Sequence, residues 1–368
     1  MNTLVSKSKL STPSSSSRSS NSSCSSNESN ESYLMELQRV NNYDPPPQQC
    51  ISITSHRSLA ILSGHVGSVS CLALCGEFIL SASQGKDIIV WQQPDLRLFA
   101  KFGQGDGSVK ALATVGNKVF TAHQDSRIRV WKVSRSSENV FKLVDTLPTK
   151  KDYLGSWDKT LKVWNVCDLK CLESIKAHDD AINGLVACKG IVYSASADGK
   201  IKAWGKGKEG LHCLKGVLEG HKDVSINSVV VSDDGNWVYG GSSDGYVMGY
   251  EKSFENWKVV CEKKAHEMAV LCMCLIGEFL FTGSADKSIG IWKREVFGKI
   301  CKVGVINGHE GPVKCLQGSS SNRIGGGFLL YSGSLDKSVR VWWVPRYDEK
   351  TQVEESINQH HHPMLAKC

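Results

Sequence analysis

The segment TGSADKSIGIW, residues 282–292, contains the pattern that decides the fold. It begins with small residues, continues with a tight turn around Asp286, and then alternates apolar residues with others up to Trp292. Two short segments of this kind on either side of a turn rich in Asp, Gly or Ser are typical of a β-hairpin. The segment therefore predicts two antiparallel strands joined at Asp286.

The same pattern recurs along the chain, and its period indicates the architecture. It reads SASQGKDIIVW to Trp91, TAHQDSRIRVW to Trp131, GSWDKTLKVW to Trp164, SASADGKIKAW to Trp204, GGSSDGYVMGY to Tyr250 and SGSLDKSVRVW to Trp342. The closing aromatic residues of the seven copies are 40, 33, 40, 46, 42 and 50 residues apart. Repeats of this length are typical of β-propellers, in which each copy forms a blade of four strands.

A second apolar column lies in phase with the first. In six copies a Val or Ile starts a short apolar run, and another apolar residue follows three positions later. The pairs are Val69 and Leu72, Val109 and Leu112, Ile182 and Leu185, Ile226 and Val229, Val270 and Met273, and Val313 and Leu316. The first column precedes the closing aromatic residue by 22 residues in four copies and by 24 and 29 in the other two. Two columns in phase predict an inner strand in six of the seven copies.

Histidines stand just upstream of the second column in five copies, and most follow Gly or Ala. They are His65, His178, His221, His266 and His309. A Gly-His pair and a closing Trp in a repeat of this length resemble the WD40 family. The resemblance covers about residues 57–345. It implies an all-β WD40 propeller that acts as a protein-interaction platform without catalysis.

The resemblance also implies a structural network within each blade. A buried indole N–H needs an acceptor, and in the family a strand Ser or Thr supplies it. The His then bonds the hydroxyl, and the turn Asp anchors the His, so that a fully satisfied network fixes one geometry. Three copies contain all four members: His178, Ser194, Asp198 and Trp204; His266, Thr282, Asp286 and Trp292; His309, Ser332, Asp336 and Trp342.

A Ser-His-Asp set also suggests a hydrolase, and this interpretation is rejected. A nucleophile occurs once and needs an oxyanion hole, whereas this set recurs at equivalent repeat positions beside a Trp. No phosphate loop or metal-ligand motif is present. We therefore expect no enzyme activity, no catalytic residue, no cofactor and no metal.

Three other copies depart from the network. Gly85 stands where Asp is expected in repeat 1, and Gly105 stands where His is expected in repeat 2. Repeat 5 has Gly240 in place of the hydroxyl residue and Tyr250 in place of Trp. These blades are expected to depend more on strand packing than on the polar network.

The two ends of the repeat region predict how the ring closes. The segment HRSLAILSGH, residues 56–65, resembles an outer strand but has no blade before it, while the sequence after Trp342 is polar and irregular. We therefore expect residues 57–62 to complete the last blade, which removes the exposed sheet edges of an open ring. The predicted fold is a seven-bladed propeller closed by an N-terminal strand.

The third repeat is shorter than the others. Only 33 residues separate Trp131 from Trp164, Leu154 occupies the hydroxyl position, and no His or inner-strand column is present. The segment FKLVDTLPT, residues 141–149, is predicted to be the outer strand of blade 2. Blade 3 is therefore expected to be truncated and to lack its innermost strand. Such a gap exposes strand edges and an apolar wall, so we expect the chain to melt at a lower temperature than an intact relative.

The phrases TLPTKKDYL, GSWDKTLKVW and CLESIKAHDDAINGL resemble plant WD40 proteins of the JINGUBANG type. In that family a longer stretch separates the first phrase from the second, and here the two are joined near Leu154 and Gly155. A skipped exon, a faulty gene model and a genuine shortened isoform all remain open as explanations. The resemblance implies a role in plant signalling or transcriptional regulation.

The two ends of the chain differ in composition from the repeats. Residues 1–45 are rich in Ser and predict a disordered tail, which is either a plain tail, a phosphorylated tail or a plastid transit peptide. Residues 346–368 predict a second polar, disordered tail, in which the run His360, His361 and His362 is incidental rather than a metal site. The predicted domains are thus 1–45, the propeller at 57–345, and 346–368.

Composition limits the compartment and the partners. The chain has no 18-residue apolar run, no secretory signal and no Cys-x-x-Cys pair among its 14 cysteines. Cys71, Cys272, Cys274 and Cys315 lie in apolar runs, where a free thiol acts as a small hydrophobe. These features predict a monomeric propeller in the cytoplasm or nucleus, with no membrane partner. A net charge of +7 is too mild to favour nucleic-acid binding.

The candidate partner-binding residues precede the turn Asp, because in the family this position points toward one face. They are Gln124, Trp157, Ala197, Ser243, Ala285 and Leu335. Trp157 and then Leu335 are the strongest candidates, since Trp is enriched at interface hot spots. Trp157 packing on a neighbouring loop is the competing interpretation. A basic loop after blade 4, with Lys200, Lys202, Lys206 and Lys208, is either solvated or a site for an acidic partner.

Three functions remain as candidates. The first is an adaptor that binds other proteins, which the family resemblance favours. The second is an RNA-associated propeller, for which salt-dependent RNA affinity would be the sign. The third is a substrate receptor of a cullin-type ubiquitin ligase, for which the sequence from Trp164 to Cys167 lacks the final basic residue of the expected motif.

Overall fold

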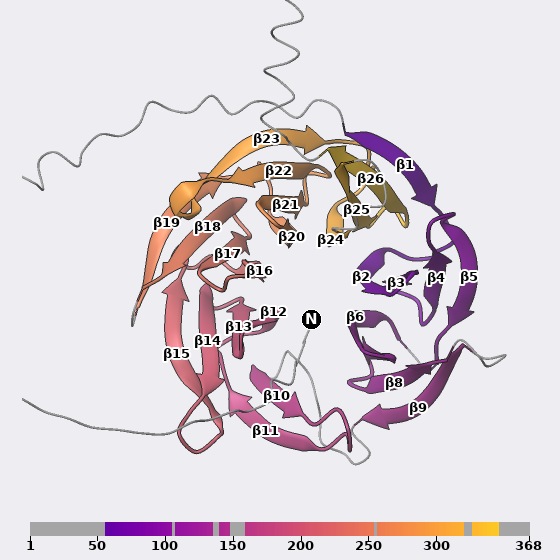
Figure 1. The fold of residues 1–368 in the computed structure, drawn as a ribbon, viewed down its shortest axis with the longest axis horizontal. Coiled ribbons are helices and arrows are strands. Elements are labelled where there is room, and N and C mark those ends of the chain that lie inside the picture. The colour runs from indigo at the N-terminus through magenta and orange to yellow at the C-terminus, as the bar shows by residue number, and fades with distance from the viewer. Residues whose placement is uncertain are drawn as a thin grey trace, which may run out of the picture. The chain divides into compact units, whose positions relative to one another are not determined.

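The computed structural model describes residues 56–104, 107–134, 140–147, 159–253, 256–319 and 326–345. Within these ranges the chain forms β-strands and one short 3-10 helix, η2 (Val296–Gly298). The strands form sheets that surround a central space (Figure 1). No helix in the described ranges has the length and apolar character that a membrane crossing requires. The predicted tails at 1–45 and 346–368, and Trp157, lie outside the described residues.

Each sheet takes the number of its repeat. Repeat 1 contains β2 (Val69–Cys75), β3 (Phe78–Ser83), β4 (Ile88–Gln92) and β5 (Arg97–Phe102), and repeat 2 contains β6 (Val109–Val115), β7 (Lys118–His123), β8 (Ile128–Val133) and β9 (Phe141–Leu147). Repeat 3 contains β10 (Thr160–Trp164) and β11 (Cys171–Lys176). Repeat 4 contains β12 (Ile182–Cys188), β13 (Ile191–Ser196), β14 (Lys200–Lys206) and β15 (His212–Glu219).

The remaining strands complete the ring. Repeat 5 contains β16 (Ile226–Val231), β17 (Trp237–Ser242), β18 (Tyr246–Lys252) and β19 (Trp257–Lys264), and repeat 6 contains β20 (Val270–Ile276), β21 (Phe279–Ser284), β22 (Ile289–Arg294) and β23 (Ile300–Ile306). Repeat 7 contains β24 (Val313–Ser319), β25 (Gly327–Ser334) and β26 (Val339–Pro345), and β1 (Arg57–Leu62) joins them. All pairings are antiparallel, and in blades 1, 2, 4, 5 and 6 the strands run in sequence order from the centre outward, whereas β1 is the outermost strand of blade 7 (Figure 1).

The burial of each strand follows its place in the blade. Every residue of β3, β21 and β25 is buried, because the second strand of a blade has a neighbouring blade on both faces. The outer strand β5 has only exposed and half-buried residues. Apolar residues followed by small ones therefore form the second strands, whereas more polar sequences form the outermost ones.

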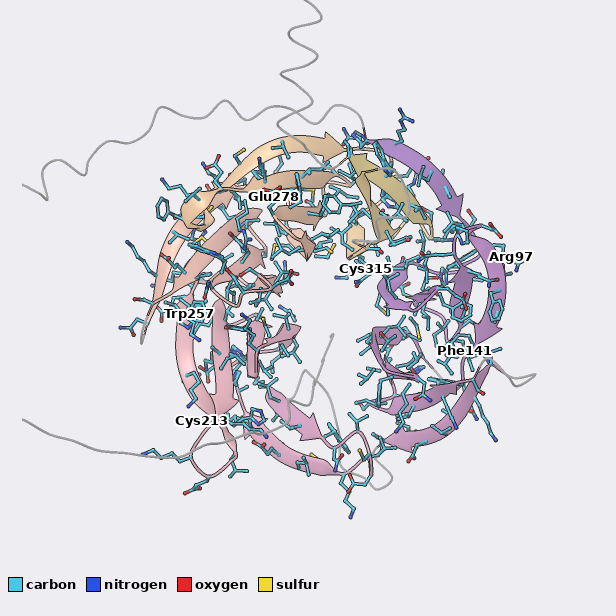
Figure 2. All side chains as sticks on the ribbon, in the orientation of Figure 1. Arg97, Phe141, Cys213, Trp257, Glu278 and Cys315 are labelled. Atoms are coloured by element: carbon cyan, nitrogen blue, oxygen red, sulfur yellow. The ribbon has the colours of Figure 1, made fainter. Side chains whose placement is uncertain are left out.

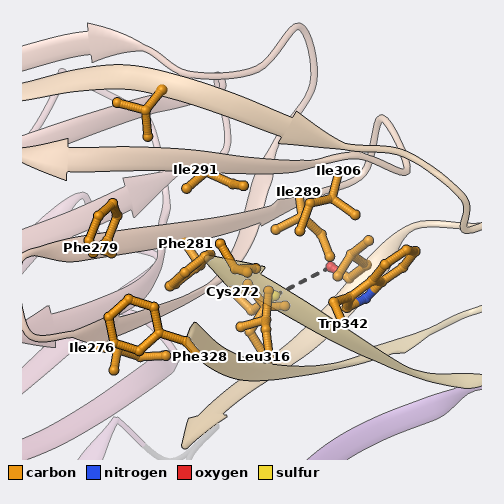
Figure 3. Close-up of a cluster of buried hydrophobic side chains, with 14 residues drawn as sticks. Cys272, Ile276, Phe279, Phe281, Ile289, Ile291, Ile306, Leu316, Phe328 and Trp342 are labelled. Carbon is orange, nitrogen blue, oxygen red and sulfur yellow. Dashed lines mark hydrogen bonds between the residues drawn. The ribbon is translucent and has the colours of Figure 1, made fainter. Parts of the chain in front are cut away.

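Apolar side chains join neighbouring blades. Between blades 6 and 7, Phe279, Phe281 and Ile291 pack against Phe328 and Trp342, and Figure 3 shows this interlocking. Burial of such side chains contributes about 1.5–3 kcal/mol each. Similar contacts join blades 1 and 2, where Phe102 stacks on Phe141 with ring centroids 4.6 Å apart. Phe141 is labelled in Figure 2.

The predicted N-terminal closure is confirmed. Strand β1 pairs antiparallel with β26, and Leu62 lies opposite Val339. Leu62 is buried in the cluster that joins blade 7 to blade 1. The first and last described strands thus complete one blade, so the outer edge of β26 is covered.

The seven-blade prediction is wrong and is corrected to six blades of four strands. In the described residues, repeat 3 supplies only the two-stranded sheet of β10 and β11. Twelve residues (148–159) separate β9 from β10, whereas 23 or more separate the corresponding strands elsewhere. At about 3.3 Å per residue, twelve residues hold one six-residue strand and its connections, but not two.

Candidate interaction site

The complete networks of repeats 4, 6 and 7 share one geometry. In repeat 4, Nε2 of His178 lies 2.7 Å from Oγ of Ser194, and its Nδ1 lies 2.8 Å from Oδ2 of Asp198. The indole of Trp204 donates to the same hydroxyl at 2.9 Å. The structure brings the corresponding residues of the other two repeats together at 2.7–3.0 Å. The hydroxyl thus accepts from Trp and donates to a neutral His, whose other nitrogen donates to Asp.

Repeats 1 and 2 keep the central Ser or Thr hydroxyl with its His and Trp contacts, which we call the hub. Their His makes no hydrogen bond to a turn Asp in the described residues. His65 lies 2.8 Å from Ser81, which accepts the Trp91 indole at 2.9 Å. In repeat 2, His123 replaces the missing upstream His, and its Nε2 lies 2.8 Å from Oγ1 of Thr121. This blade therefore keeps a buried set of His, Thr and Trp, in which the His comes from the second strand instead of from the loop upstream. Because alternate residues of a strand share one face, His123 reaches Thr121 from within β7.

Repeat 5 has a different arrangement, because Gly240 offers no hydroxyl. His221 is half-buried and lies 2.6 Å from Oδ2 of Asp244 and 3.1 Å from Oε1 of Glu262. The hydroxyl of Tyr250 donates to the carbonyl of Glu219 at 2.8 Å. The histidine here therefore joins two carboxylates near the surface instead of a buried hub.

The network is structural and not a hydrolase centre. Burial lowers the pKa of His65 and of His123 to about 4, and it lowers the pKa of His178 as well. Ser194 and Ser332 are fully buried, so a substrate carbonyl has no access to their hydroxyls. Burial also raises the pKa of Cys71 to about 11 and of Cys274 to about 12, which suppresses thiolate chemistry. Among the described residues, no group of three or more metal-ligating side chains occurs.

The network predicts that acid destabilises the protein. The buried histidines (His65, His123, His178, His266 and His309) have a pKa below the ordinary 6.5 because of burial. As the pH falls below 6.5, these histidines take up protons in the unfolded chain but stay neutral in the folded chain. The free energy of unfolding therefore decreases progressively toward pH 4. His221 has the opposite sign, because its hydrogen bond to Asp244 raises its pKa. Its stabilising contribution is present below pH 6.5 and is lost as the pH rises through its raised value.

Urea unfolding at pH 7.5 and 4.5 measures this effect, and we expect a lower midpoint at pH 4.5. The His221→Asn variant is the matched control, and we expect its acid loss to be larger than that of the unmodified protein. Equal or higher stability at pH 4.5 would contradict the assignment of neutral, buried histidines.

The turn residues of the network lie on one loop face of the ring. Leu335 is 40% exposed, Gln124 and Ser243 are exposed, and Ala197 and Ala285 are half-buried. Val66 is 89% exposed and lies in the loop that contacts the turn of blade 7, where Ser68 donates to the carbonyl of Leu335 at 3.4 Å. We call Val66 and Leu335 the loop-face patch. The sequence did not single out Val66, although it directly follows the network residue His65.

The predicted basic loop after blade 4 is corrected. Lys200, Lys202 and Lys206 lie within strand β14 and not in a loop. Lys202 donates to the carbonyl of Ala177 at 2.8 Å, and Lys200 lies 3.9 Å from Glu219. Of the four lysines, only Lys208 lies in the loop after β14, and two of the other three already have partners.

The position of repeat 3 has a second candidate surface, which lies between blades 2 and 4. Inner strands pack side by side from β6 through β2, β24, β20 and β16 to β12, and no comparable contact joins β12 to β6 among the described strands. In Figure 1, β10 and β11 lie at the outer side between these blades. We call the place between β6 and β12 the inner slot.

Half-buried apolar residues face the inner slot from both sides. On blade 2 they are Phe120, Ala122 and Ile128, and on blade 4 they are Leu185 and Val192. The residues equivalent to Phe120 and Ile128 in the other five blades are at most 1% exposed. The equivalents of Phe120 are Leu80, Tyr193, Tyr239, Phe281 and Tyr331. The equivalents of Ile128 are Ile88, Ile201, Val247, Ile289 and Val339. The apolar wall that the sequence predicted beside repeat 3 thus includes Phe120 and Ile128, which are more exposed than their equivalents in the other blades.

Trp164, the closing Trp of repeat 3, is also less buried than its equivalents. It is only half-buried, and its indole makes no hydrogen bond in the described part of the chain. In the five repeats with a closing Trp and a complete sheet, the indole donates to a Ser or Thr of the second strand at 2.8–3.0 Å. Lys118 still links blade 2 to repeat 3, because its ammonium donates to the carbonyl of Val166 at 2.9 Å.

Comparison with protein families agrees with this geometry. The pattern of the WD domain, G-beta repeat, matches residues 56–92, 169–205, 212–250, 257–293 and 300–342, which together make up more than half of the chain. The chain belongs to the WD40 repeat family. The five matched WD40 segments exclude repeats 2 and 3, where the His column is missing or displaced. WD40 propellers typically bind other proteins and are generally non-enzymatic.

Relatives at low identity include several plant proteins. LIN-1 of Lotus japonicus, which is named for E3 ubiquitin-protein ligase activity, is 23% identical over 64% of this chain and 19% of its own length. The zinc finger CCCH domain-containing protein 62 of Arabidopsis thaliana is 29% identical over 47% of this chain and 39% of its own. The guanine nucleotide-binding protein subunit beta of Zea mays is 23% identical over 76% of this chain and 82% of its own. The chain thus spans less than half the length of the first two relatives.

Proposed function

We propose that this WD40 protein is a non-enzymatic adaptor that binds partner proteins through its loop face. The observation that carries the proposal is the loop-face patch, in which Val66 and Leu335 expose apolar side chains on neighbouring loops. The rigid blades beneath fix these loops, so binding has a low ordering cost. The buried hubs leave no accessible nucleophile, which supports the non-enzymatic assignment.

The finer assignment is a JINGUBANG-type role in plant signalling or transcriptional regulation. The phrases around the third repeat and the low-identity relatives from Lotus, Arabidopsis and maize support this proposal. It is accompanied by the proposals that the propeller is monomeric and that it acts in the cytoplasm or nucleus.

A second candidate function is that of a substrate receptor for a ubiquitin ligase. The similarity to LIN-1 favours it. The sequence after Trp164 opposes it, because Cys167 stands where the receptor motif has a basic residue. No observation on the described residues favours RNA binding, since the lysines of β14 are partly engaged.

Affinity purification with quantitative mass spectrometry tests the adaptor proposal. We compare the full chain with a Val66→Asp and Leu335→Asp double variant, with Trp157→Ala, and with Leu98→Asp as the control. Leu98 is 52% exposed on the outer strand β5. We expect the double variant to lose a set of partners by tenfold or more, while the Leu98 variant retains them. Identical partner lists for all four proteins would refute binding through the loop face.

A further inference from the structure

We propose that two apolar tips at the end of the ring opposite the loop face insert into an anionic lipid membrane. The first tip is the connection between β14 and β15, where Leu211 is 56% exposed. The second is the connection between β22 and β23, where Val296 is 75% and Phe297 is 72% exposed. This inference goes beyond the adaptor function and does not depend on it. It differs from the sequence prediction of no membrane partner, because a surface contact needs no membrane-spanning segment.

Both tips lie at the same end of the ring because of the strand order. In each of these blades a turn on the loop face joins the second and third strands, and antiparallel pairing returns the chain to the other end before the fourth strand begins. Figure 1 shows both connections at the outer side of the ring, on either side of blade 5. A flat surface therefore contacts both tips at once, whereas a single pocket would receive only one of them. Such a contact leaves the loop face free for protein partners.

Each tip is a five-residue turn closed by the same two backbone hydrogen bonds, from the first N–H to the fifth carbonyl and from the fourth N–H to the first carbonyl. The bonds measure 2.7 and 3.1 Å in residues 207–211, and 2.8 and 3.3 Å in residues 295–299. The fourth residue is a glycine in both turns, Gly210 and Gly298, with φ of +80° and +72°. The hydroxyl of Tyr239 also donates to the carbonyl of Gly298 at 2.8 Å. The apolar side chains thus project from fixed turns, so their insertion has a low ordering cost.

Folding does not account for a phenylalanine at position 297. Its φ of +64° lies in the left-handed region, which favours Gly, Asn or Asp and disfavours a bulky side chain. The exposed ring gains little from burial in the folded chain. Stability alone would therefore favour another residue, and an outlier of this kind at an exposed tip indicates a role in binding.

Exposed lysines surround the tips. Strands β18 and β19 of blade 5 contact η2, so their ends lie between the two tips. The lysines beside Leu211, at these strand ends and after Phe297 are Lys206, Lys208, Lys252, Lys258 and Lys299. Among the described residues of the three connections, Glu209 is the one exposed carboxylate. The exposed carboxylates Asp233, Asp234 and Glu278 lie in turns between first and second strands, nearer to the centre of the ring.

This arrangement matches the chemistry of a membrane surface. Anionic headgroups attract the lysine ammonium groups, and the acyl region beneath the headgroups accepts the apolar side chains. Positive charge and apolar tips at one end of the ring therefore complement an anionic bilayer.

Cosedimentation with vesicles tests the proposal. We compare the binding of the full-length protein to phosphatidylcholine vesicles with and without phosphatidylserine. We expect binding only to the vesicles with phosphatidylserine, and a decrease of this binding on addition of salt. Phe297→Asn removes the inserted ring and suits the left-handed backbone, so it should weaken binding about tenfold while the fold is retained. Lys299→Glu should weaken binding about fivefold or more. Leu98→Asn, at an exposed site on the outer strand β5, is the matched control and should bind as the unmodified protein does.

Three results would overturn the proposal. The first is no binding of the unmodified protein to vesicles with phosphatidylserine, which would leave a protein as the candidate occupant of the tips. The second is equal binding to both kinds of vesicle. The third is unchanged binding of both Phe297→Asn and Leu211→Asn, since the tips would then stay outside the bilayer. Circular dichroism verifies the fold of each variant, and because the two substitutions lie in different blades, either variant alone suffices as the test. Partners that depend on the loop-face patch would survive these results, so the adaptor function stands or falls separately.

Discussion

Replacing Trp342 with Ala is expected to lower the free energy of unfolding by about 3–5 kcal/mol. Trp342 is 3% exposed, packs between blades 6 and 7, and donates to Ser332 at 2.8 Å. The change removes a large apolar side chain, and it also leaves the hub of His309 and Ser332 without its indole donor. Because β26 pairs with β1, the loss also weakens the blade that closes the ring.

Trp164→Ala is the matched control for this prediction. It makes the same substitution at the equivalent repeat position, but Trp164 is half-buried and its indole makes no hydrogen bond among the described residues. We therefore expect Trp164→Ala to lower the free energy of unfolding by less than half as much as Trp342→Ala. Urea unfolding of both variants provides the comparison. Equal losses would contradict the conclusion that repeat 3 lacks the packing and the hub of the other blades.

The repeats made most of the fold predictable from the sequence. The hairpin around Asp286 and the column from Val69 to Val313 each depend on local periodicity, and they placed the second and inner strands of the blades correctly. The closing strand at 57–62 was predictable because an outer-strand pattern stood before any blade. The number of blades was not predictable from counting copies, since a copy without room for two inner strands still retains its closing Trp164.

The departures within the site have physical reasons that the repeat alignment does not contain. His123 occupies the place of an absent upstream His because it lies two residues from Thr121 on the same face of a strand. The spacing of those two residues was the available signal. His221 turns toward Glu262 because Gly240 removes the hydroxyl that holds the other histidines. The pairing of His221 with Glu262, which are 41 residues apart in the sequence, depends on tertiary structure and has no local signature.

Giving repeat 3 the full length of a four-stranded blade is expected to raise the melting temperature by about 5 °C or more. The design replaces residues 148–159 with residues 177–199 of repeat 4, AHDDAINGLVACKGIVYSASADG, which join an outer strand to a third strand in an intact blade. The graft supplies an inner strand and a second strand with a Ser for the Trp164 indole. It would bury Phe120 and Ile128, and each half-buried side chain that becomes fully buried contributes of the order of 1 kcal/mol.

A graft of equal length made of Gly and Ser is the control for this design, and we expect it to melt at or below the temperature of the unmodified chain. Calorimetry of the three proteins measures the effect, and equal midpoints for the two grafts would contradict the view that unfilled walls limit stability.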